Sequence, residues 1–239
     1  MENDRSRGRL IVFEGIEGAG KTTQLQQTHQ WLSNQTSEDG TFPTVIVTRE
    51  PGGTHLGVRI RQLLLEQPDA DPIGERAELL LYAADRAAHV AGLIEPHLAV
   101  GAIVLCDRYT ESTIAYQGYG RGLDLDTIEQ LNQIATGGRL SDLTLWLDLD
   151  PTEGLNRARE RGQLDRMERE NLAFHQRVRQ GYATLAQTQP DRIVRVEATG
   201  TTAEVQGRIQ EVLQLKIPHL CLLKQTPKTP DGQFQQTAS

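Results

Sequence analysis

The sequence predicts an α/β fold in which helices cover both faces of a parallel β-sheet. Short apolar runs alternate with longer helical patterns along most of its 239 residues, and such alternation is typical of parallel strands joined by helices. A glycine-rich motif also lies between the first apolar run and the first helical pattern. In such sheets ligands bind beyond the carboxyl ends of the strands, so the residues that follow each predicted strand are the first candidates for function.

The predicted elements follow one another in regular order, and the chain length suits one such domain or two small ones. Short apolar runs predict five strands, at residues 9–14, 44–48, 102–106, 143–147 and 192–196. Helical patterns predict seven helices, at residues 22–33, 55–66, 74–100, 126–135, 151–161, 168–186 and 202–215. Residues 33–43 are polar and contain glycine, which indicates a loop. The polar, proline-bearing segment 224–239 predicts a disordered tail after a single domain at residues 1–223.

The composition restricts the class of partner and the compartment. A formal net charge of −7 argues against a general nucleic-acid-binding or membrane-binding surface, so local arginine clusters must hold any anionic ligand. The two cysteines, Cys106 and Cys221, form no disulfide framework and suit a reducing compartment. The first nine residues are polar and charged, unlike a signal peptide, and no apolar stretch is long enough to span a bilayer. We therefore expect a cytoplasmic protein.

The glycine-rich motif at residues 15–22 matches the phosphate-binding pattern G-x-x-x-x-G-K-[ST], the P-loop. Backbone N–H groups of such a loop and the following helix N-terminus form a site for phosphate. Lys21 supplies a charge for the β- and γ-phosphates, and Thr22 supplies a hydroxyl for Mg²⁺. Lys21 is also the only lysine before Lys216 in a chain that otherwise uses arginine. The alternative is a glycine-rich turn without a ligand, and the flanking strand and helix argue against it.

Charged residues follow three further predicted strands. Arg49 follows the second predicted strand, in the segment TREPGGT, and so lies at the carboxyl edge of the sheet, where an anion would bind. The alternative is an ordinary turn with a solvated Arg–Glu pair. Asp107 and Arg108 follow the third strand and suit a carboxylate for Mg²⁺ beside a guanidinium for phosphate. Asp148, after the fourth strand, is a rival for the metal. We favour Asp107, because Asp148 could instead cap the next helix.

Two residues of the third predicted helix could recognise a nucleobase. Tyr82 and Arg86 are spaced i, i+4 and share a helix face. An aromatic ring beside a guanidinium could stack on a base and bond its edge. A core tyrosine with a solvated arginine is the alternative.

A cluster of arginines at residues 157–166 ends one helix and could form a lid. Arg157 and Arg161 share a helix face, and Gly162 then ends the helix. Such a cluster can place positive charge over a transferring phosphoryl group. We favour Arg161 for this role because it lies nearest to Gly162, with Arg157 or Arg166 as alternatives. Without the P-loop, a solvated basic face would be the better interpretation.

Taken together, these motifs resemble those of the thymidylate kinase family. The matching segments run in family order within residues 9–215, and they are GIEGAGKTT, TREPGGT, LYAADRAAHV, CDRYTESTIAYQGYGRG, DLTLWLDLDP and RARERGQLDRME. The resemblance implies transfer of the γ-phosphoryl group of ATP to dTMP, with Mg²⁺. It also implies a P-loop NTPase fold of the nucleoside monophosphate kinase type, with five parallel strands, and a homodimer.

The resemblance further implies residue roles. ATP would bind at Gly15, Ile16, Glu17, Gly18, Ala19, Gly20, Lys21, Thr22, Thr23, Arg157 and Arg161. The acceptor dTMP would bind at Glu17, Arg49, Tyr82, Arg86, Arg108, Thr113, Tyr116 and Gln117. Within this set the arginines at 49 and 108 would bind the 5′-phosphate, the tyrosine at 82 would stack on thymine, and the arginine at 86 would bond its O4 edge. The catalytic set would be Lys21, Arg108, Arg161 and Glu17, and the metal would be served by Thr22 and Asp107.

Three positions depart from the family pattern. Tyr82 stands where phenylalanine is more frequent, so its hydroxyl needs a partner or water. Ala88 replaces a frequent glutamine, which puts any polar contact there in doubt. Gly18 stands where one subtype carries an arginine, and this resembles the bacterial subtype, in which the lid at about residues 157–167 supplies the catalytic arginine.

Two other functions are compatible with part of the sequence. A kinase for another nucleoside monophosphate would share the P-loop and the arginines, and only the resemblance argues against it. A regulatory ATP-binding module would need no acceptor site, so Arg49 and Arg108 would have no role in it. The sequence also contains no guanine-reading N-K-x-D motif.

Overall fold

The computed structural model describes residues 8–36, 43–66, 72–162, 165–217 and 224–225. Its central sheet contains β1 (Arg9–Glu14), β3 (Val45–Arg49), β4 (Ile103–Asp107), β5 (Leu143–Asp148) and β6 (Ile193–Glu197). The five strands are parallel and lie in the order β3-β4-β1-β5-β6. The predicted parallel sheet is therefore confirmed, and each predicted strand lies within one residue of its observed bounds.

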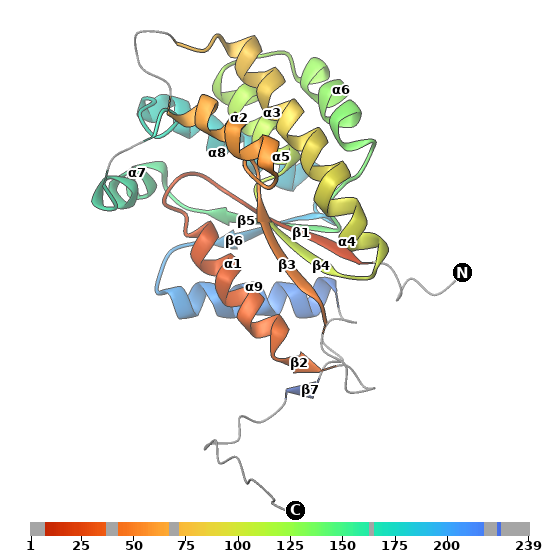
Figure 1. The fold of residues 1–239 in the computed structure, drawn as a ribbon. Coiled ribbons are helices and arrows are strands. Elements are labelled where there is room, and N and C mark those ends of the chain that lie inside the picture. The colour runs from red at the N-terminus through yellow and green to blue at the C-terminus, as the bar shows by residue number, and fades with distance from the viewer. Residues whose placement is uncertain (1–7, 37–42, 67–71, 163–164, 218–223, 226–239) are drawn as a thin grey trace, which may run out of the picture.

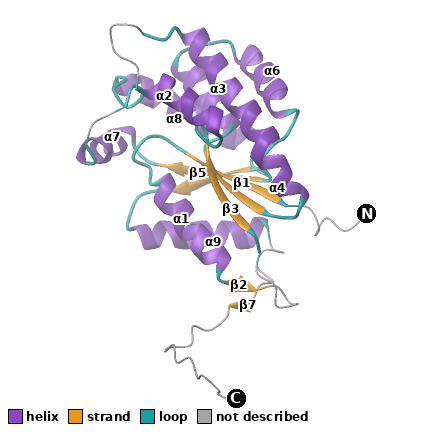
Figure 2. Ribbon diagram, in the orientation of Figure 1, coloured by secondary structure: helices purple, strands orange, loops and turns teal. Residues whose placement is uncertain are grey.

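Helices cover both faces of the sheet (Figures 1 and 2). One face is covered by α1 (Lys21–Ser33) and α9 (Thr202–Lys216). The opposite face carries α3 (Glu75–His89), α4 (Glu95–Ala99), α6 (Leu125–Thr136) and α8 (Leu172–Thr188). Two further helices, α2 (His55–Leu65) and α7 (Pro151–Glu160), follow β3 and β5. This arrangement explains why the central strands β1, β4 and β5 are apolar runs rather than alternating patterns, since both of their faces are buried.

Alternate residues of the central strand pack into different parts of the core. Leu10 and Val12 belong to a cluster with Val90, in the segment that joins α3 to α4. Ile11 and Phe13 belong to the larger cluster, which contains residues of α1 and of α8. A shift of β1 by one residue would exchange these faces, so packing fixes its register. The position of the P-loop, which follows β1, is fixed with it.

Three helical segments differ from the sequence prediction. The helix predicted at 74–100 consists of α3, a π-helical segment η1 (Val90–Ile94) and α4. The helix predicted at 168–186 begins only at Leu172, because the Asn171 side chain caps it by accepting the Phe174 N–H. No element was predicted at 110–120, where the structure has α5 (Thr110–Thr113) and the π-helical segment η2 (Ile114–Gly120).

A second, two-stranded sheet lies beyond the end of α1 (Figure 1). It pairs β2 (Gln35–Thr36) with β7 (Lys224–Gln225) in antiparallel orientation. Part of the predicted loop at 33–43 and the first two residues of the predicted tail therefore form strands. Residues 226–239 lie outside the described residues, so a disordered tail stays a prediction there.

Candidate active site

The sheet topology brings three loops together at the carboxyl ends of the strands. β1 lies between β4 and β5, and β4 lies between β1 and β3. Asp107 is in register with Phe13 of β1 and with Arg49 of β3. The P-loop, the Asp107–Arg108 pair and the Arg49 loop therefore meet at one edge.

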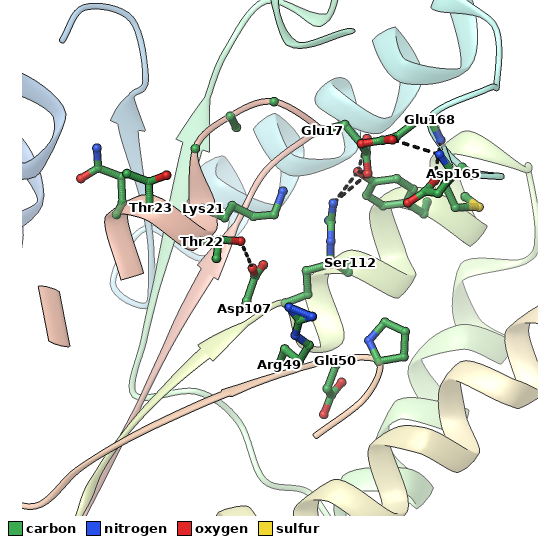
Figure 3. A pocket seen from close by; sticks show the side chains of 18 of the residues that line it. Glu17, Lys21, Thr22, Thr23, Arg49, Glu50, Asp107, Ser112, Asp165 and Glu168 are labelled. Atoms are coloured by element: carbon green, nitrogen blue, oxygen red, sulfur yellow. Dashed lines mark hydrogen bonds and ion pairs between the residues drawn. The ribbon is translucent and has the colours of Figure 1, made fainter. Parts of the chain in front are cut away.

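These loops enclose a cavity of about 480 Å³. Figure 3 shows Lys21, Thr22 and Asp107 on one side of it, with Arg49 and Glu50 beside them. Every predicted site residue lines the cavity except Gly15 and Ile16. The rival metal residue Asp148 and the alternative lid residue Arg166 do not line it.

The P-loop lysine is held by the loop that precedes it. The Lys21 ammonium donates to the carbonyl oxygens of Gly15, at 3.0 Å, and of Ile16, at 2.9 Å. These two residues thus hold Lys21 without lining the cavity. Burial, together with the nearby Arg108 charge, lowers the pKa of Lys21 to about 8. An anion in the cavity would favour the charged lysine.

Close packing explains the glycine at position 18. Gly18 has a φ of +72°, and a Cβ atom there would lie 2.1 Å from the Gly154 carbonyl oxygen of α7. No side chain fits this position unless α7 moves away. An arginine is thus excluded from the P-loop by the helix that leads into the lid.

Asp107, and not Asp148, lies beside the P-loop threonine. The Thr22 hydroxyl donates to Asp107 Oδ2 at 2.9 Å. Asp148 accepts instead from the guanidinium groups of Arg179 and Arg195. The idea that Asp148 caps the next helix was wrong, because the N-cap of α7 is Asp150, which accepts the Thr152 N–H.

Arg108 lies at the centre of a polar network. It is the only described non-glycine residue with positive φ, at 75°, a sparsely populated conformation that the surrounding contacts must hold. Its guanidinium donates to Glu17 Oε1 at 2.8 Å and to the Tyr116 hydroxyl at 3.1 Å. Tyr116 in turn donates to Glu17. Arg108 and Glu17, both predicted to bind dTMP, therefore pair with each other in this structure.

Glu17 remains ionised in this network. Burial alone would raise the pKa of its carboxyl group, but the Arg108 guanidinium, His175 and Lys21 hold that pKa well below its usual range. His175 Nδ1 lies 3.5 Å from Glu17 Oε2, and neither ring nitrogen has a hydrogen-bond partner among the described residues.

The loop that carries Arg108 is hydrogen-bonded to Glu14, at the end of β1. This buried carboxylate accepts the backbone N–H groups of Tyr109 and Ser112, and the hydroxyl groups of Ser112 and Tyr182. Burial raises the pKa of Glu14 to about 7. Glu14 thus fixes the turn in which Arg108 adopts its unusual backbone angle.

The predicted base-binding residues lie on α3 and on the α5–η2 segment. Tyr82 is half-buried, and its ring lines the cavity. Arg86 is 2% exposed and forms an ion pair with Glu50 at 2.8 Å. Glu50 is therefore not part of a solvated Arg–Glu pair. Gln117 donates to Glu78 at 2.7 Å, which leaves its amide oxygen for other partners.

The three lid arginines differ in their surroundings. Arg161 is 64% exposed and pairs with Glu168, whereas Arg157 lies within 3.4 Å of the Gly18 carbonyl oxygen. Arg166 instead donates to the Leu64 carbonyl oxygen and pairs with the buried Glu78. Arg157 and Arg161 line the cavity, and Arg166 anchors the segment to α2 and α3.

Sequence reasoning missed the buried residues that hold the cavity-lining side chains and loops in place. They are Glu14, Glu50, Glu78, His89, Asn132, His175 and Tyr182. Each partner pair is separated by tens of residues along the chain, so no local pattern identifies it. A buried position for Glu14 could have been inferred, because it continues the apolar run of β1.

No described helix is both long and apolar enough to cross a membrane. Within the same part of the chain, no cluster of three or more His, Cys, Asp or Glu side chains could hold a metal ion. Any metal at Thr22 and Asp107 would therefore need further ligands from water or from a bound nucleotide.

Comparison with known proteins agrees with the motifs. The thymidylate kinase family model matches residues 13–209. The thymidylate kinase of Cyanothece sp. (strain PCC 7425 / ATCC 29141) is 56% identical over 223 residues, which cover 88% of this chain and 95% of that protein. The thymidylate kinase of Nostoc punctiforme (strain ATCC 29133 / PCC 73102) is 55% identical over 214 residues, which cover 89% and 99%.

A solved structure shows the same fold. The crystal structure of thymidylate kinase from Ehrlichia chaffeensis superposes with a TM-score of 0.70 at 34% sequence identity, covering 87% of this chain and 100% of that one. The family match spans most of the chain, including the P-loop from Gly15 onward, the Arg49 loop, the Asp107–Arg108 pair and the lid. The chain therefore belongs to the thymidylate kinase family.

Proposed function

We propose that this protein transfers the γ-phosphoryl group of ATP to the 5′-phosphate of dTMP, giving ADP and dTDP. The observation that carries the proposal is that one cavity is lined by the P-loop lysine and by the three arginines predicted to bind the acceptor, Arg49, Arg86 and Arg108. Family membership supports dTMP as the acceptor.

The donor nucleotide binds at the P-loop. Backbone N–H groups of residues 15–20 and the N-terminus of α1 face the phosphates, and Lys21 leaves its carbonyl partners to contact them. Thr22 and Asp107 offer two hard oxygen atoms, which fit Mg²⁺ with its remaining ligands from water and phosphate. Mg²⁺ bound there supplies positive charge to the β- and γ-phosphates.

The acceptor binds between α3 and the loop after β4. Arg49 is exposed at the end of β3 and binds the 5′-phosphate together with Arg108. The phosphate then competes with Glu17 for the Arg108 guanidinium. As Arg108 turns toward phosphate, Glu17 becomes available to the sugar 3′-OH. The Tyr82 ring stacks on the base.

The reaction needs positive charge rather than a general base. The second pKa of a phosphate monoester is about 6, so the acceptor oxygen is already largely ionised near neutral pH. That oxygen forms a bond to the γ-phosphorus, the bond to the β–γ bridging oxygen breaks, and ADP leaves with the electron pair. Arginines at 49, 108 and 161 and the lysine at 21 offset the repulsion between the two polyanions.

An acceptor panel tests this proposal. The purified protein is assayed with ATP and Mg²⁺ against dTMP, dUMP, dCMP, dGMP and AMP, with a reaction lacking acceptor as the control. We expect dTMP to have the highest kcat/KM and EDTA to abolish turnover. Preference for another monophosphate would identify a different kinase, and ATP hydrolysis unaffected by any acceptor would identify a regulatory module.

Assembly and compartment stay predictions. The family resemblance supports a homodimer, which sedimentation of the purified chain would test. The two cysteines suit a reducing compartment, and this supports a cytoplasmic location.

A further inference from the structure

The Arg86 guanidinium is almost completely occupied by protein partners. Nε donates to Glu50 Oε2 at 2.8 Å, and Nη1 donates to Thr113 Oγ1 at 2.8 Å and to Asn132 Oδ1 at 2.7 Å. Nη2 donates to the Tyr109 carbonyl oxygen at 2.9 Å. An arginine has five N–H groups, so four are used and one, on Nη2, has no acceptor among the described residues. Since Arg86 also lines the cavity, that N–H is the one available to a ligand.

The carboxylate partner of Arg86 is itself held in place. His89, one turn further along α3, lies with Nδ1 2.9 Å from Glu50 Oε1 and with Nε2 2.7 Å from the Thr48 hydroxyl. Both Glu50 and His89 are buried. The Glu50 carboxylate therefore cannot rotate without breaking a second contact, and this fixes the direction of the Arg86 Nε–H bond.

The amide partner comes from a different part of the fold. Asn132 lies on α6, is 6% exposed and does not line the cavity. Its Oδ1 accepts from Arg86, and its Nδ2 lies 3.5 Å from the Thr110 carbonyl oxygen. Asn132 thus contacts the Arg86 guanidinium without lining the cavity.

We propose that Asn132 is a positioning residue, which together with the Glu50–His89 pair holds Arg86 so that one N–H faces the nucleobase. A single fixed N–H donates to a carbonyl oxygen on the ring, but it meets the N–H of an amino group at the same ring position, which offers it no acceptor. A guanidinium carries donors only, so it cannot accept a hydrogen bond from the amino group. The site therefore selects a 4-oxo pyrimidine over a 4-amino pyrimidine, and Asn132 contributes to that selection from outside the cavity. This inference rests on the proposed function, since it takes dTMP as the ligand.

The experiment measures binding of dTMP and of dCMP by titration calorimetry in the absence of ATP. The variants are Asn132→Ala, Asn132→Leu, which fills the space without an acceptor, and Asn132→Asp, which keeps an acceptor oxygen. Gln130→Ala, at an exposed amide of the same helix, is the matched control. Thermal unfolding of each variant reports whether the fold is retained.

We expect Asn132→Ala and Asn132→Leu each to lower the ratio of dTMP affinity to dCMP affinity about tenfold, because the Arg86 N–H is no longer held in one direction. Asn132→Asp and Gln130→Ala should keep the wild-type ratio, and binding of an ATP analogue should not change. If a folded Asn132→Leu or Asn132→Ala protein keeps the wild-type ratio, Asn132 only packs α6 and the inference is wrong, even if the melting temperature falls. If the wild type itself does not prefer dTMP over dCMP, the proposed acceptor is wrong and this inference fails with it.

Discussion

At the scale of single residues, the site depends on charged groups whose partners in this structure come from the protein itself. Lys21 rests on P-loop carbonyl oxygens, and Arg108 pairs with Glu17. We expect both cations to exchange these partners for phosphate when the substrates bind. Such contacts satisfy charges that would be costly to bury without a partner.

Replacing Lys21 by alanine tests the P-loop. We expect kcat to fall by roughly 10²–10³ because charge stabilisation of the transferring group is lost. Steady-state kinetics with dTMP and ATP measure this, and thermal unfolding shows whether the fold is intact. Lys216→Ala, at an exposed lysine near the end of α9, is the control. Near-normal turnover of the Lys21 variant would contradict the P-loop assignment.

Replacing Tyr82 tests the base site. Tyr82→Ala should raise the KM for dTMP, because aromatic stacking contributes about 1–3 kcal/mol per base. Tyr82→Phe keeps the ring and should keep the KM. A Tyr82→Ala protein that melts early but uses dTMP normally would mean that the ring is only part of the core.

At the scale of elements, the lid combines an anchored end and an exposed end. Arg166 is tied to Glu78 of α3 and to the carbonyl of Leu64 in α2, whereas Arg161 is largely in solvent at the end of α7. The exposed arginine can move toward ATP while the anchored one keeps the segment attached. The packing of α7 against Gly18 leaves no room for an arginine at position 18, which supports our proposal that the lid supplies the cation.

Arginine variants of the lid test this division. Arg161→Ala should lower kcat about 10²-fold with little change in the KM for dTMP, the pattern of a contact made in the transition state. Arg159→Ala, at an exposed arginine of the same helix outside the cavity, is the control. If alanine at 157 and at 161 both leave kcat unchanged, the lid does not act in catalysis.

At the scale of the whole molecule, buried carboxyl groups make stability depend on pH. Burial and the neighbouring Glu50 carboxylate raise the pKa of Asp85 to about 6, from an ordinary value of 3.8. Its Oδ1 accepts the Gly52 N–H, while Oδ2 has no hydrogen-bond partner among the described residues. A raised pKa means that the folded state binds the proton more tightly. This contribution to stability is complete below about pH 3.8 and is lost as the pH rises through about 6.

Asp85→Asn removes this titration while keeping an acceptor for Gly52. We expect the stability of the variant relative to wild type to increase from pH 5 to pH 8, because only the wild type then buries an ionised carboxylate at position 85. A shift of about two pKa units corresponds to up to about 3 kcal/mol. Urea unfolding at several pH values measures the trend, with Asp126→Asn on the exposed surface of α6 as the control. A constant difference across this range would contradict the raised pKa.

The sequence alone predicted the sheet and the P-loop, arginine and base-site residues that line the cavity. The central strands β1, β4 and β5 are apolar because both of their faces are buried, and all five predicted strands lie within one residue of their observed bounds. The P-loop, Arg49 and Asp107 follow such strands, and parallel topology places strand ends at one edge. The segment at 110–120 was missed because Gly118 and Gly120 disfavour a helix in isolation. Packing requires glycine at both positions, because a Cβ atom would lie 2.5 Å from Leu125 at position 118 and 2.6 Å from Phe174 at position 120.

Only the tertiary structure decided which groups hold those side chains in place. Asn132 is 46 residues from Arg86 along the chain, and Tyr182 is 168 residues from Glu14. The contact of Thr22 with Asp107 and the ion pair of Arg166 with Glu78 likewise appear only in the folded chain. Local patterns cannot encode such pairs, because they form only after the strands and helices pack. Burial then requires each polar group to find a partner, and the fold determines which one is within reach.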